Sequence, residues 1–367
     1  MSKIKPFSAL YYIKNNKCRA GICMFMMFLA SMTFIAGNYI RSVFYPFDKE
    51  FEYSDKIVEV DLQSTDEDYR DYNTFLKKVK SDKKLDCVER TSYGFGGMQH
   101  GTVFNLDMGG WTYVFNSRED MEKAFKHLGI KGDFSKCKNN SLVISSDFAK
   151  NKGIKHGDKI DQTFDENLSG EYTVDAIIND GSFCSFYIYE DNESLGRAYV
   201  FSEQMEGKEL YDYVNNLADG LKVKVNESER DYSMPQFSIF YVIFYLLDVL
   251  IAVVLAITVN SVVTGQYLKR TYEFGVYRAL GMSRGEIKRK VAAEIFQINI
   301  IACAAGFIAI WLFTYMINEL FYKREGLQIL FCSETGLIGF IICDALIIVP
   351  LILSKGRMMS KADVTEF

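Results

Sequence analysis

Four long stretches with almost no charge constrain the fold of this chain more than any other feature. They cover residues 20–40, 237–268, 295–318 and 335–354. Only Asp248 and Asp344 are charged within them. The core of a bilayer is about 30 Å thick, so a helix needs about 20 residues to cross it. Because only helices and closed barrels satisfy their backbone in lipid, the sequence predicts an α-helical membrane protein with four transmembrane helices.

The first stretch could instead be a cleaved signal peptide, because five basic residues precede it. A signal peptide has an apolar run of about 7 to 15 residues and an A-x-A-like cleavage site. The run here is longer and lacks such a site. We therefore expect this segment to remain in the protein as a membrane helix.

The charges between the apolar stretches predict which segments face the cytoplasm. Five basic residues precede Ala20, seven lie between Gly265 and Lys290, and three follow Ser354. Cytoplasmic segments of membrane proteins carry an excess of Lys and Arg. We therefore expect a multi-pass protein of the cell (plasma) membrane with both termini in the cytoplasm and residues 42–235 outside.

The segment 42–235 is acidic, with 24 basic and 37 acidic residues and a net charge of −13. Because the whole chain carries −5, the rest of it carries +8. This division follows the two sides of the membrane. It gives no support to nucleic-acid binding, which favours a basic patch on a soluble domain.

These features divide the chain into consecutive predicted segments. They are a cytoplasmic N-terminal segment (1–19), transmembrane helix 1 (20–41), an extracytoplasmic domain (42–235), transmembrane helix 2 (236–268), a cytoplasmic elbow (269–290), transmembrane helix 3 (291–320), a short outer loop (321–334), transmembrane helix 4 (335–354) and a cytoplasmic tail (355–367).

The large domain is predicted to mix helices and strands, in an α+β fold inserted between the first two membrane helices. Strand patterns are KIVEVDL (56–62), TVFNLDM (102–108) and WTYVFN (111–116), and helix patterns are DEDYRDYNTFLKKVKSDK (66–83) and REDMEKAFKHLGI (118–130). We expect the second of these helices to end at Gly129. A further short helix should be capped by Ser145 or Ser146 and end near Gly153.

The glycine-rich stretch SYGFGGMQHG (92–101) suggests a phosphate-binding loop, but no Gly-Lys-Ser/Thr follows it. Such a loop would lack its lysine and its metal-binding hydroxyl. We therefore interpret it as a connection between strands. His100, His127 and His156 are scattered and do not have the spacing of a metal site.

Three of the eight cysteines, Cys87, Cys137 and Cys184, fall in the large domain. Their odd number permits one disulfide and one free thiol, and their spacing matches no zinc pattern. We favour free, buried cysteines. With no nucleophile and base paired by spacing, the domain is interpreted as a binding or scaffold module and not as an enzyme.

The stretch YEFGVYRALGMSRGEIKRK (272–290) lies between the second and third apolar stretches. Phe274, Tyr277 and Leu280 recur at three-residue spacing, which predicts a short helix with an apolar stripe. Gly281 can adopt the left-handed conformation that ends a helix, so the chain can turn sharply there.

A second helix is predicted to begin at Ser283. Ser283 and Glu286 have the spacing of a capping box, and Met282 and Ile287 that of a hydrophobic staple. A basic turn that only obeys the positive-inside rule needs none of these signals. We expect that the loop cannot bury its own apolar stripe, which either lies on the lipid or docks into a groove of a partner; the capping favours docking.

The extended stretch YEFGVYRALGMSRGEIKRKVAAEIF resembles the signature of FtsX/MacB-type (type VII) ABC transporter permeases. In that family the loop between the second and third membrane helices runs Arg/Glu-Ile-Gly-x-x-Arg-Ala-Leu-Gly-Ala-Ser-x-x-x-Ile. Phe274 stands where the family commonly has Ile. NSLVISSDFAKNKGIKHGDKI resembles the external domain of MacB-like members, and MMSKADVTEF resembles their C-terminal ending.

The resemblance implies a permease that works as a dimer, with a second copy or a paralogue, and with separate ABC ATPase subunits. The elbow residues carried over by position are Glu273, Gly275, Arg278, Ala279, Leu280, Gly281 and Ser283. The family is thought to transmit ATP-driven movement to its external domain. No Walker A sequence occurs in this chain, so we expect no enzyme activity and no cofactor of its own, with ATP and Mg²⁺ bound by the partner.

Three acidic residues in or beside the membrane helices are candidate functional sites. A carboxylate in the middle of a membrane costs at least ~2.5 kcal/mol unless it is paired, protonated or facing water. Asp248 and Asp344 could therefore form polar contacts between helices that change with ATP, or be neutral carboxyls bonded to nearby Ser, Thr or Tyr. Glu294 is expected to pair with a basic neighbour.

Three functions remain open from the sequence. The first is ATP-driven export or extraction of a peptide or hydrophobic compound. The second is FtsX-like signalling, in which the external domain activates an extracellular partner such as a cell-wall hydrolase. A third, a receptor without an ATPase, would leave the capped elbow unexplained. The size of the external domain favours transport.

Overall fold

The computed structural model describes residues 17–62, 68–90, 97–168, 170–189 and 196–361. The chain forms two compact units. The first comprises Met1–Arg41, Phe240–Ile317 and Ile329–Phe367, and the second comprises Ser42–Ile239 and Asn318–Gln328.

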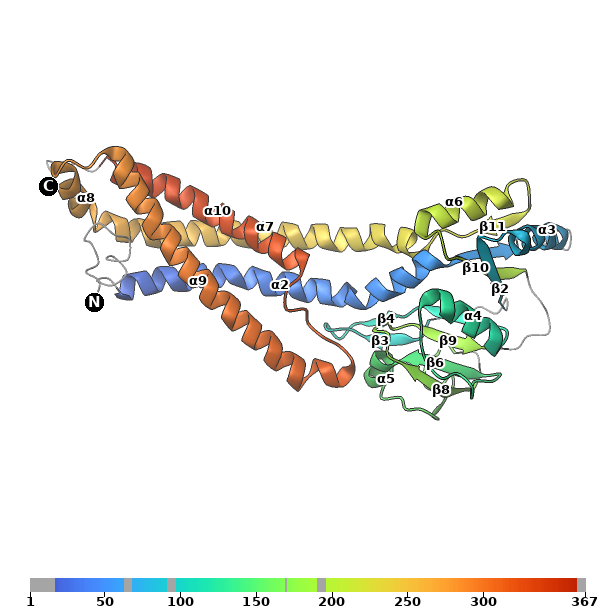
Figure 1. Ribbon diagram of the computed structural model, residues 1–367. Helices are drawn as coiled ribbons and strands as arrows, with labels where there is room; N and C mark the ends of the chain where they lie inside the picture. Colours follow the sequence, from blue (N-terminus) through green and yellow to red (C-terminus); the bar gives the residue numbers. More distant parts are fainter. Residues whose placement is uncertain (1–16, 63–67, 91–96, 169, 190–195, 362–367) are drawn as a thin grey trace. The chain divides into compact units, whose positions relative to one another are not determined.

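The first unit is helical (Figure 1). Its helices are α2 (Lys17–Lys56), α7 (Glu229–Leu268), α8 (Thr271–Ala279), α9 (Arg284–Leu320) and α10 (Glu334–Met359), of which α2, α7 and α9 also contribute residues to the second unit. Within the described residues, α2, α7, α9 and α10 are long and apolar enough to cross a membrane. They fit the predicted multi-pass membrane protein.

Two of these helices run well beyond the apolar stretches that predict them. α2 continues to Lys56, past the predicted end of the membrane segment at residue 41, and α7 starts at Glu229 instead of near 236. The charge-free length of a segment predicts the part that suits lipid. It does not predict where the helix ends, because polar residues continue a helix equally well.

Glycines let the helices of the first unit approach closely. A Cβ added at Gly37 in α2 would lie 2.4 Å from the backbone of Gly336 in α10, and one at Gly306 in α9 would lie 2.0 Å from the Ser31 hydroxyl. Small residues at such contacts are typical of helices that associate in membranes. At the first contact, buried Asn38 accepts hydrogen bonds from the Ser333 backbone N–H and hydroxyl, at 2.9 and 2.8 Å.

The second unit contains a four-stranded antiparallel sheet in the order β11-β1-β10-β2 (Figure 1). Its strands are β1 (Val58–Leu62), β2 (Leu85–Glu89), β10 (Arg197–Ser202) and β11 (Val223–Val225). One face packs on α3 (Asp68–Ser81) and α6 (Gly207–Ala218). Because side chains alternate along a strand, β10 buries Val200 under these helices and Tyr199 and Phe201 in a second core.

That second core lies against a five-stranded mixed sheet in the order β5-β9-β6-β8-β7. Its strands are β5 (Thr112–Phe115), β6 (Ser141–Ser145), β7 (Lys159–Ile160), β8 (Tyr172–Ile178) and β9 (Ser185–Ile188). Helix α4 (Arg118–Leu128) contributes Met121, Ala124 and Phe125 to the core, and α5 (Ser146–Lys152) follows β6. The remaining elements are the hairpin of β3 (Gln99–Gly101) and β4 (Asp107–Gly109) and the 3-10 helix η1 (Tyr322–Glu325).

The segment that leads from α9 to α10 is part of the second unit as far as Gln328. The Asn151 amide donates to the Glu325 carbonyl at 3.0 Å, and the Tyr322 hydroxyl donates to the Val103 carbonyl at 2.9 Å. Gly326 approaches α5 so closely that an added Cβ would lie 2.1 Å from the Asp147 carbonyl oxygen. The predicted outer loop is therefore packed onto the domain.

Most of the strands and helices predicted for this domain are confirmed. Ser145 caps α5 through the Phe148 N–H at 3.0 Å, and Gly129 and Gly153 end α4 and α5 in left-handed conformations. The predicted strand at 102–108 is wrong over its first five residues. Residues 102–106 form the turn between β3 and β4, where Asn105 has a φ of +56°, because asparagine tolerates this conformation.

Cys87, Cys137 and Cys184 are buried and free. His100 is buried against Phe183, with ring centroids 4.2 Å apart. Within the described part of the chain, no group of three His, Cys, Asp or Glu side chains could hold a metal ion. Residues 92–96 of the glycine-rich stretch lie outside the described residues.

Candidate functional site

The elbow, residues 269–290, joins α7 to α9 through the short helix α8. After α8, Gly281 has a φ of +93°, and its N–H donates to the Arg278 carbonyl at 2.9 Å. Only glycine adopts this conformation without strain. The sharp turn predicted at Gly281 is present.

The capping box predicted at the start of α9 is also formed. The Ser283 N–H donates to the Glu286 carboxylate at 2.7 Å, and the Glu286 N–H donates to the Ser283 hydroxyl at 3.3 Å. Met282 and Ile287 pack into the same apolar cluster, where Ile287 is fully buried. Two backbone donors at the helix start are thus satisfied by neighbouring side chains, which fixes where α9 begins.

The apolar stripe of α8 is divided, which corrects the prediction of one exposed docking face. Phe274 is fully buried and stacks on Tyr267 of α7 with ring centroids 6.1 Å apart, whereas Leu280 is 71% exposed. Tyr277 lies between these extremes and contacts the Phe274 ring edge-on at 5.8 Å. Phe274 belongs to an apolar cluster that also includes residues of α2, α9 and α10, so the loop does not bury it alone.

A buried ion cluster lies behind α8. The Arg270 guanidinium donates to the Glu273 carboxylate at 2.8 and 3.0 Å and to the Glu294 carboxylate at 2.7 and 3.3 Å. Glu294 is fully buried and the Arg270 side chain is 5% exposed. This single guanidinium therefore links α8 to α9 through two charge-assisted pairs, which are stronger than neutral hydrogen bonds.

Three further side chains complete the ion cluster. Lys290 pairs with Glu294 at 3.1 Å, and the Tyr267 hydroxyl donates to Glu294 at 3.2 Å. The Tyr277 hydroxyl donates to Glu273 at 2.8 Å. With two basic and two acidic members, the cluster is neutral overall, which suits its burial.

The ion cluster shifts the protonation equilibria of the elbow. Burial by itself would raise the pKa of Glu273, but the hydrogen bonds and charge of Arg270 outweigh it and hold that pKa below its usual value. Burial would lower the pKa of Arg270, but Glu273 and Glu294 raise it. The pKa of Tyr277 is raised by burial and by its bond to Glu273. All three groups therefore keep their usual charge states near neutral pH.

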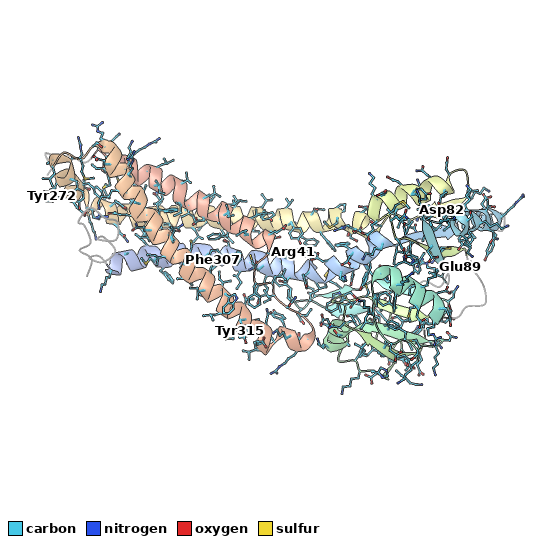
Figure 2. The ribbon with its side chains drawn as sticks, viewed as in Figure 1. Arg41, Asp82, Glu89, Tyr272, Phe307 and Tyr315 are labelled. Atoms are coloured by element: carbon cyan, nitrogen blue, oxygen red, sulfur yellow. The ribbon has the colours of Figure 1, made fainter. Side chains whose placement is uncertain are left out.

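The remaining elbow residues expected to contact a partner fall into two groups. Ala279, Leu280, Gly281, Ser283 and Glu286 are exposed, together with Tyr272, which projects from α8 (Figure 2). Glu273 and Arg278 are half-buried, and Gly275 is buried with Phe274. The exposed residues are nearly continuous from Ala279 to Glu286. We call these residues, together with Tyr272, the outer elbow surface.

The two aspartates in the membrane helices have different surroundings. Asp344 accepts a hydrogen bond from Asn299 of α9 at 3.1 Å. Asp248 is buried on the side of α7 that meets α10, where a Cβ on Gly339 would lie 2.5 Å from its Oδ2. That oxygen has no hydrogen-bond partner in the described part of the chain. The hydrogen-bond partner of Asp344 is therefore Asn299, and not the Ser, Thr or Tyr that the sequence suggested.

Sequence reasoning missed Arg270, Lys290 and Tyr267 as parts of the site. Lys290 could have been named, because it precedes Glu294 by four residues, and Arg270 precedes Glu273 by three. The contacts of Arg270 and Tyr267 with Glu294 could not have been predicted in this way, since 24 and 27 residues separate the partners. We expected one basic neighbour for Glu294, and the structure shows two, Arg270 and Lys290.

The family comparison covers this part of the molecule. Residues 236–360 match the family described as FtsX-like permease C-terminal, and they make up about a third of the chain. The match does not specify a MacB-type subfamily. No curated protein matches the chain. Over residues 236–360, which include the elbow and its ion cluster, this chain is similar to the FtsX-like permeases.

Proposed function

We propose that this chain is the permease subunit of an ABC transporter and that a separate ATPase docks on the elbow. The match of residues 236–360 to the FtsX-like permease C-terminal family carries this proposal. The elbow geometry supports it, because a capped helix start and a glycine turn hold a short helix at a fixed place. ATP and Mg²⁺ would bind to the partner.

In this proposal the outer elbow surface meets the ATPase, and the ion cluster carries the movement onward. Tyr272 and Leu280 are 62% and 71% exposed, so they can reach a groove on another chain. Glu273 contacts Arg270 and Tyr277 instead of facing out. Its proposed role therefore changes from touching the ATPase to fastening α8 to the neighbouring helices.

We further propose that movement reaches the second unit by mechanotransmission in a dimer, formed with a second copy or a paralogue. α2, α7 and α9 each contribute residues to both units, so the chain itself connects them. The proposed placement has the elbow and both termini in the cytoplasm and the second unit outside, as the positive-inside bias predicts. The cargo would be a peptide or hydrophobic compound, and signalling to an external partner such as a cell-wall hydrolase is the alternative.

Co-purification with a co-expressed ABC ATPase subunit tests the docking. We expect Tyr272→Ala with Leu280→Ala to reduce recovery of the ATPase about tenfold or more, because exposed aromatic and large apolar residues supply most interface energy. Phe321→Ala is the matched control, since Phe321 is 62% exposed but lies outside the elbow. Undiminished ATPase recovery with the double variant would refute docking at this surface.

A transport assay separates export from signalling. Proteoliposomes containing the permease and its ATPase should move the cargo only with ATP if the chain is a transporter. If ATP changes the hydrogen exchange of the second unit but no peptide or hydrophobic compound moves, the signalling alternative holds.

A further inference from the structure

The turn between β3 and β4, residues 102–106, exposes two large apolar side chains, and we call it the hairpin tip. Phe104 is 46% exposed and Leu106 is 58% exposed, on either side of Asn105. The turn is well defined, because the Asn105 N–H donates to the Thr102 carbonyl at 2.8 Å and the Thr102 N–H donates to the Leu106 carbonyl at 2.9 Å. The backbone therefore holds both apolar side chains at the surface.

The hairpin tip is fastened to the segment that follows α9. The Tyr322 hydroxyl donates to the Val103 carbonyl at 2.9 Å. Asn151 of α5 links the same two elements, because its side-chain amide accepts from the Gly101 N–H at 2.8 Å and donates to the Glu325 carbonyl at 3.0 Å. All of these residues belong to the second unit, so its own packing fixes where the tip lies.

This segment begins where a membrane helix ends. α9 is long and apolar enough to cross a membrane, and its last residue, Leu320, is 50% exposed. Phe321 follows at 62% exposure and directly precedes Tyr322. Tyrosine is enriched where membrane helices leave the lipid. Through the bond of Tyr322 to Val103, the apolar surface at the end of α9 therefore continues onto the hairpin tip.

Exposed apolar side chains are not spread evenly over the second unit. Apart from the hairpin tip, Phe321 and the helices α2, α7 and α9, only Phe164 and Ile177 are large, apolar and exposed among the described residues of this unit. Single exposed apolar residues are common, but a gathering of them marks a surface that something covers.

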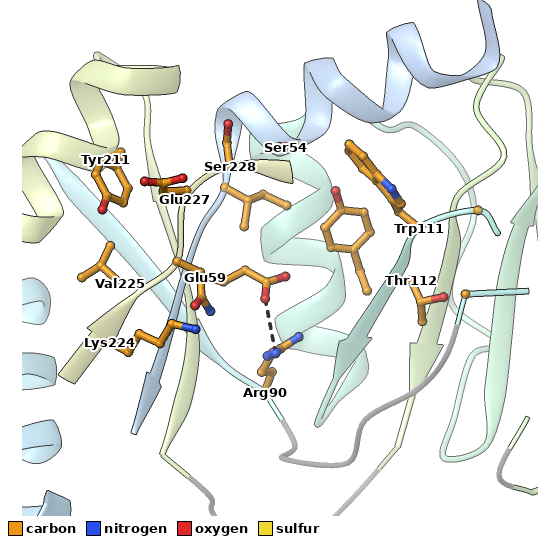
Figure 3. A pocket seen from close by; sticks show the side chains of 15 residues that line it. Ser54, Glu59, Arg90, Trp111, Thr112, Tyr211, Lys224, Val225, Glu227 and Ser228 are labelled. Carbon is orange, nitrogen blue, oxygen red and sulfur yellow. Dashed lines mark ion pairs between the residues drawn. The ribbon is translucent and has the colours of Figure 1, made fainter. Parts of the chain in front are cut away.

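A cavity of about 740 Å³ in the same unit has a different character. Arg90 at its wall pairs with Glu59 at 3.3 Å and with Asp61 at 3.7 Å, and Lys224 and Glu227 add charges of both signs (Figure 3). The hairpin tip does not line this cavity. The tip is therefore a separate surface, and its two apolar side chains suit lipid.

We propose that the hairpin tip inserts Phe104 and Leu106 into the membrane surface where α9 leaves the bilayer. The lipid is the occupant because the tip is continuous with the end of a membrane helix, which the bilayer surrounds. Apolar side chains at such a surface lie about 5–10 Å deep, at the boundary between headgroups and acyl chains. Asp107, which follows the tip, pairs with Lys152 at 3.9 Å, and this pair offsets its charge beside the lipid. The contact requires α9 to cross a membrane, but it does not require an ATPase at the elbow.

A tryptophan at the hairpin tip can report its depth in the full-length chain. The two native tryptophans are replaced by Trp111→Phe and Trp311→Phe, and Phe104→Trp is added. The purified chain is placed in nanodiscs of phosphatidylcholine, either plain or brominated near the headgroup end of the acyl chains, because bromine quenches tryptophan emission at short range. We expect at least about twofold lower emission in the brominated nanodiscs, since the side chain lies at that depth.

Matched variants locate the contact. Glu203→Trp in the same background places the reporter after β10, where the native side chain is 71% exposed, and should show no quenching. Leu106→Glu, added to the Phe104→Trp reporter, should reduce the quenching because a carboxylate is disfavoured in lipid. Leu106→Phe keeps an apolar side chain at the same position and should leave the quenching intact.

Three results would overturn the proposal. The first is equal emission of the Phe104→Trp reporter in the two kinds of nanodisc, which a tip covered by a second copy or by another protein would also give. The second is quenching no stronger than that of the Glu203→Trp reporter. The third is quenching that Leu106→Glu leaves unchanged.

Discussion

At the scale of single residues, Glu294 joins α9 to the elbow through two charged partners and one tyrosine. Arg270, Lys290 and Tyr267 all converge on its carboxylate, which is fully buried. A buried charge left without its partner is far more damaging than a lost surface pair. The elbow should therefore depend on this carboxylate much more than on the exposed charges of α9.

We predict that Glu294→Ala loosens α8 strongly, because Arg270 and Lys290 would remain buried without their shared partner. The expected loss of local stability is about 3–5 kcal/mol. Glu319→Ala, in the same helix, removes an exposed ion pair with Lys323 and should cost at most about 1 kcal/mol. Hydrogen exchange of residues 271–279 in the detergent-solubilised chain measures both. Similar exchange in the two variants would contradict the role given to the ion cluster.

His100 makes the second unit sensitive to acid. Burial, with a smaller effect of Lys152, lowers the pKa of His100 to about 4, against an unfolded value of about 6.5. The unfolded chain therefore binds a proton more readily, so stability is full above pH 6.5, approximately, and is lost as the pH falls toward 4.

We predict that His100→Phe reduces the acid-dependent loss in the free energy of unfolding by about 3 kcal/mol. The phenyl ring suits the site, which already contains Phe47 and Phe183 around the imidazole. Urea unfolding at pH 7 and pH 4.5, followed by Trp111 emission in the Trp311→Phe chain, measures the effect. An equal drop in stability for both proteins between the two pH values would show that His100 is not the titrating group.

At the scale of secondary-structure elements, the membrane helices are held together by close backbone contacts at glycines as well as by polar contacts. α2 and α10 meet at Gly37 and Gly336, and α2 and α9 meet at Ser31 and Gly306. Phe307 of α9 packs its ring 4.9 Å from that of Phe34 in α2 (Figure 2). These contacts leave little room for added atoms.

We predict that Gly37→Ala destabilises the first unit by about 1–3 kcal/mol, because the added methyl group meets backbone and not a movable side chain. Gly21→Ala is the matched control in the same helix, since nothing lies within 4 Å of its added Cβ. Thermal unfolding in detergent compares them. If Gly37→Ala is as stable as Gly21→Ala, α2 and α10 do not approach in this way.

The elements show which features could be predicted from sequence. The cap at Ser283, the turn at Gly281 and the ends of α4 and α5 depend on residues within a few positions of one another, and these predictions are confirmed. The burial of Phe274 depends on packing against other helices, which the local pattern does not contain. The failure at 102–106 has a local cause, because the turn residue Asn105 was read as part of an alternating strand.

At the scale of the whole molecule, the chain passes between its two units several times. α2, α7 and α9 each enter both, and the segment Asn318–Gln328 is packed within the second unit. The apolar stretches predicted the membrane helices but gave no sign that this loop would join the domain, because its contacts are with residues 103, 147 and 151.

We predict that Gly326→Ala releases this segment from α5, because the new Cβ would meet the Asp147 backbone in addition to straining a φ of +64°. Gly220→Ala carries the same kind of strain at +75° with nothing within 4 Å of its Cβ. Hydrogen exchange of residues 146–152 should rise in the first variant only. A rise in both variants, or in neither, would contradict the docking of the loop.

The proposed function requires a cytoplasmic elbow and an external second unit, and the sidedness of the elbow can be measured directly. Leu280→Cys and Glu203→Cys are introduced separately into a chain whose native cysteines are replaced; both side chains are exposed, Leu280 at 71% and Glu203 at 71%. Intact cells are treated with a maleimide that cannot cross the membrane. The proposed function predicts labelling at position 203 in intact cells and at position 280 only after permeabilisation; labelling at position 280 in intact cells would leave the elbow out of reach of any ATPase.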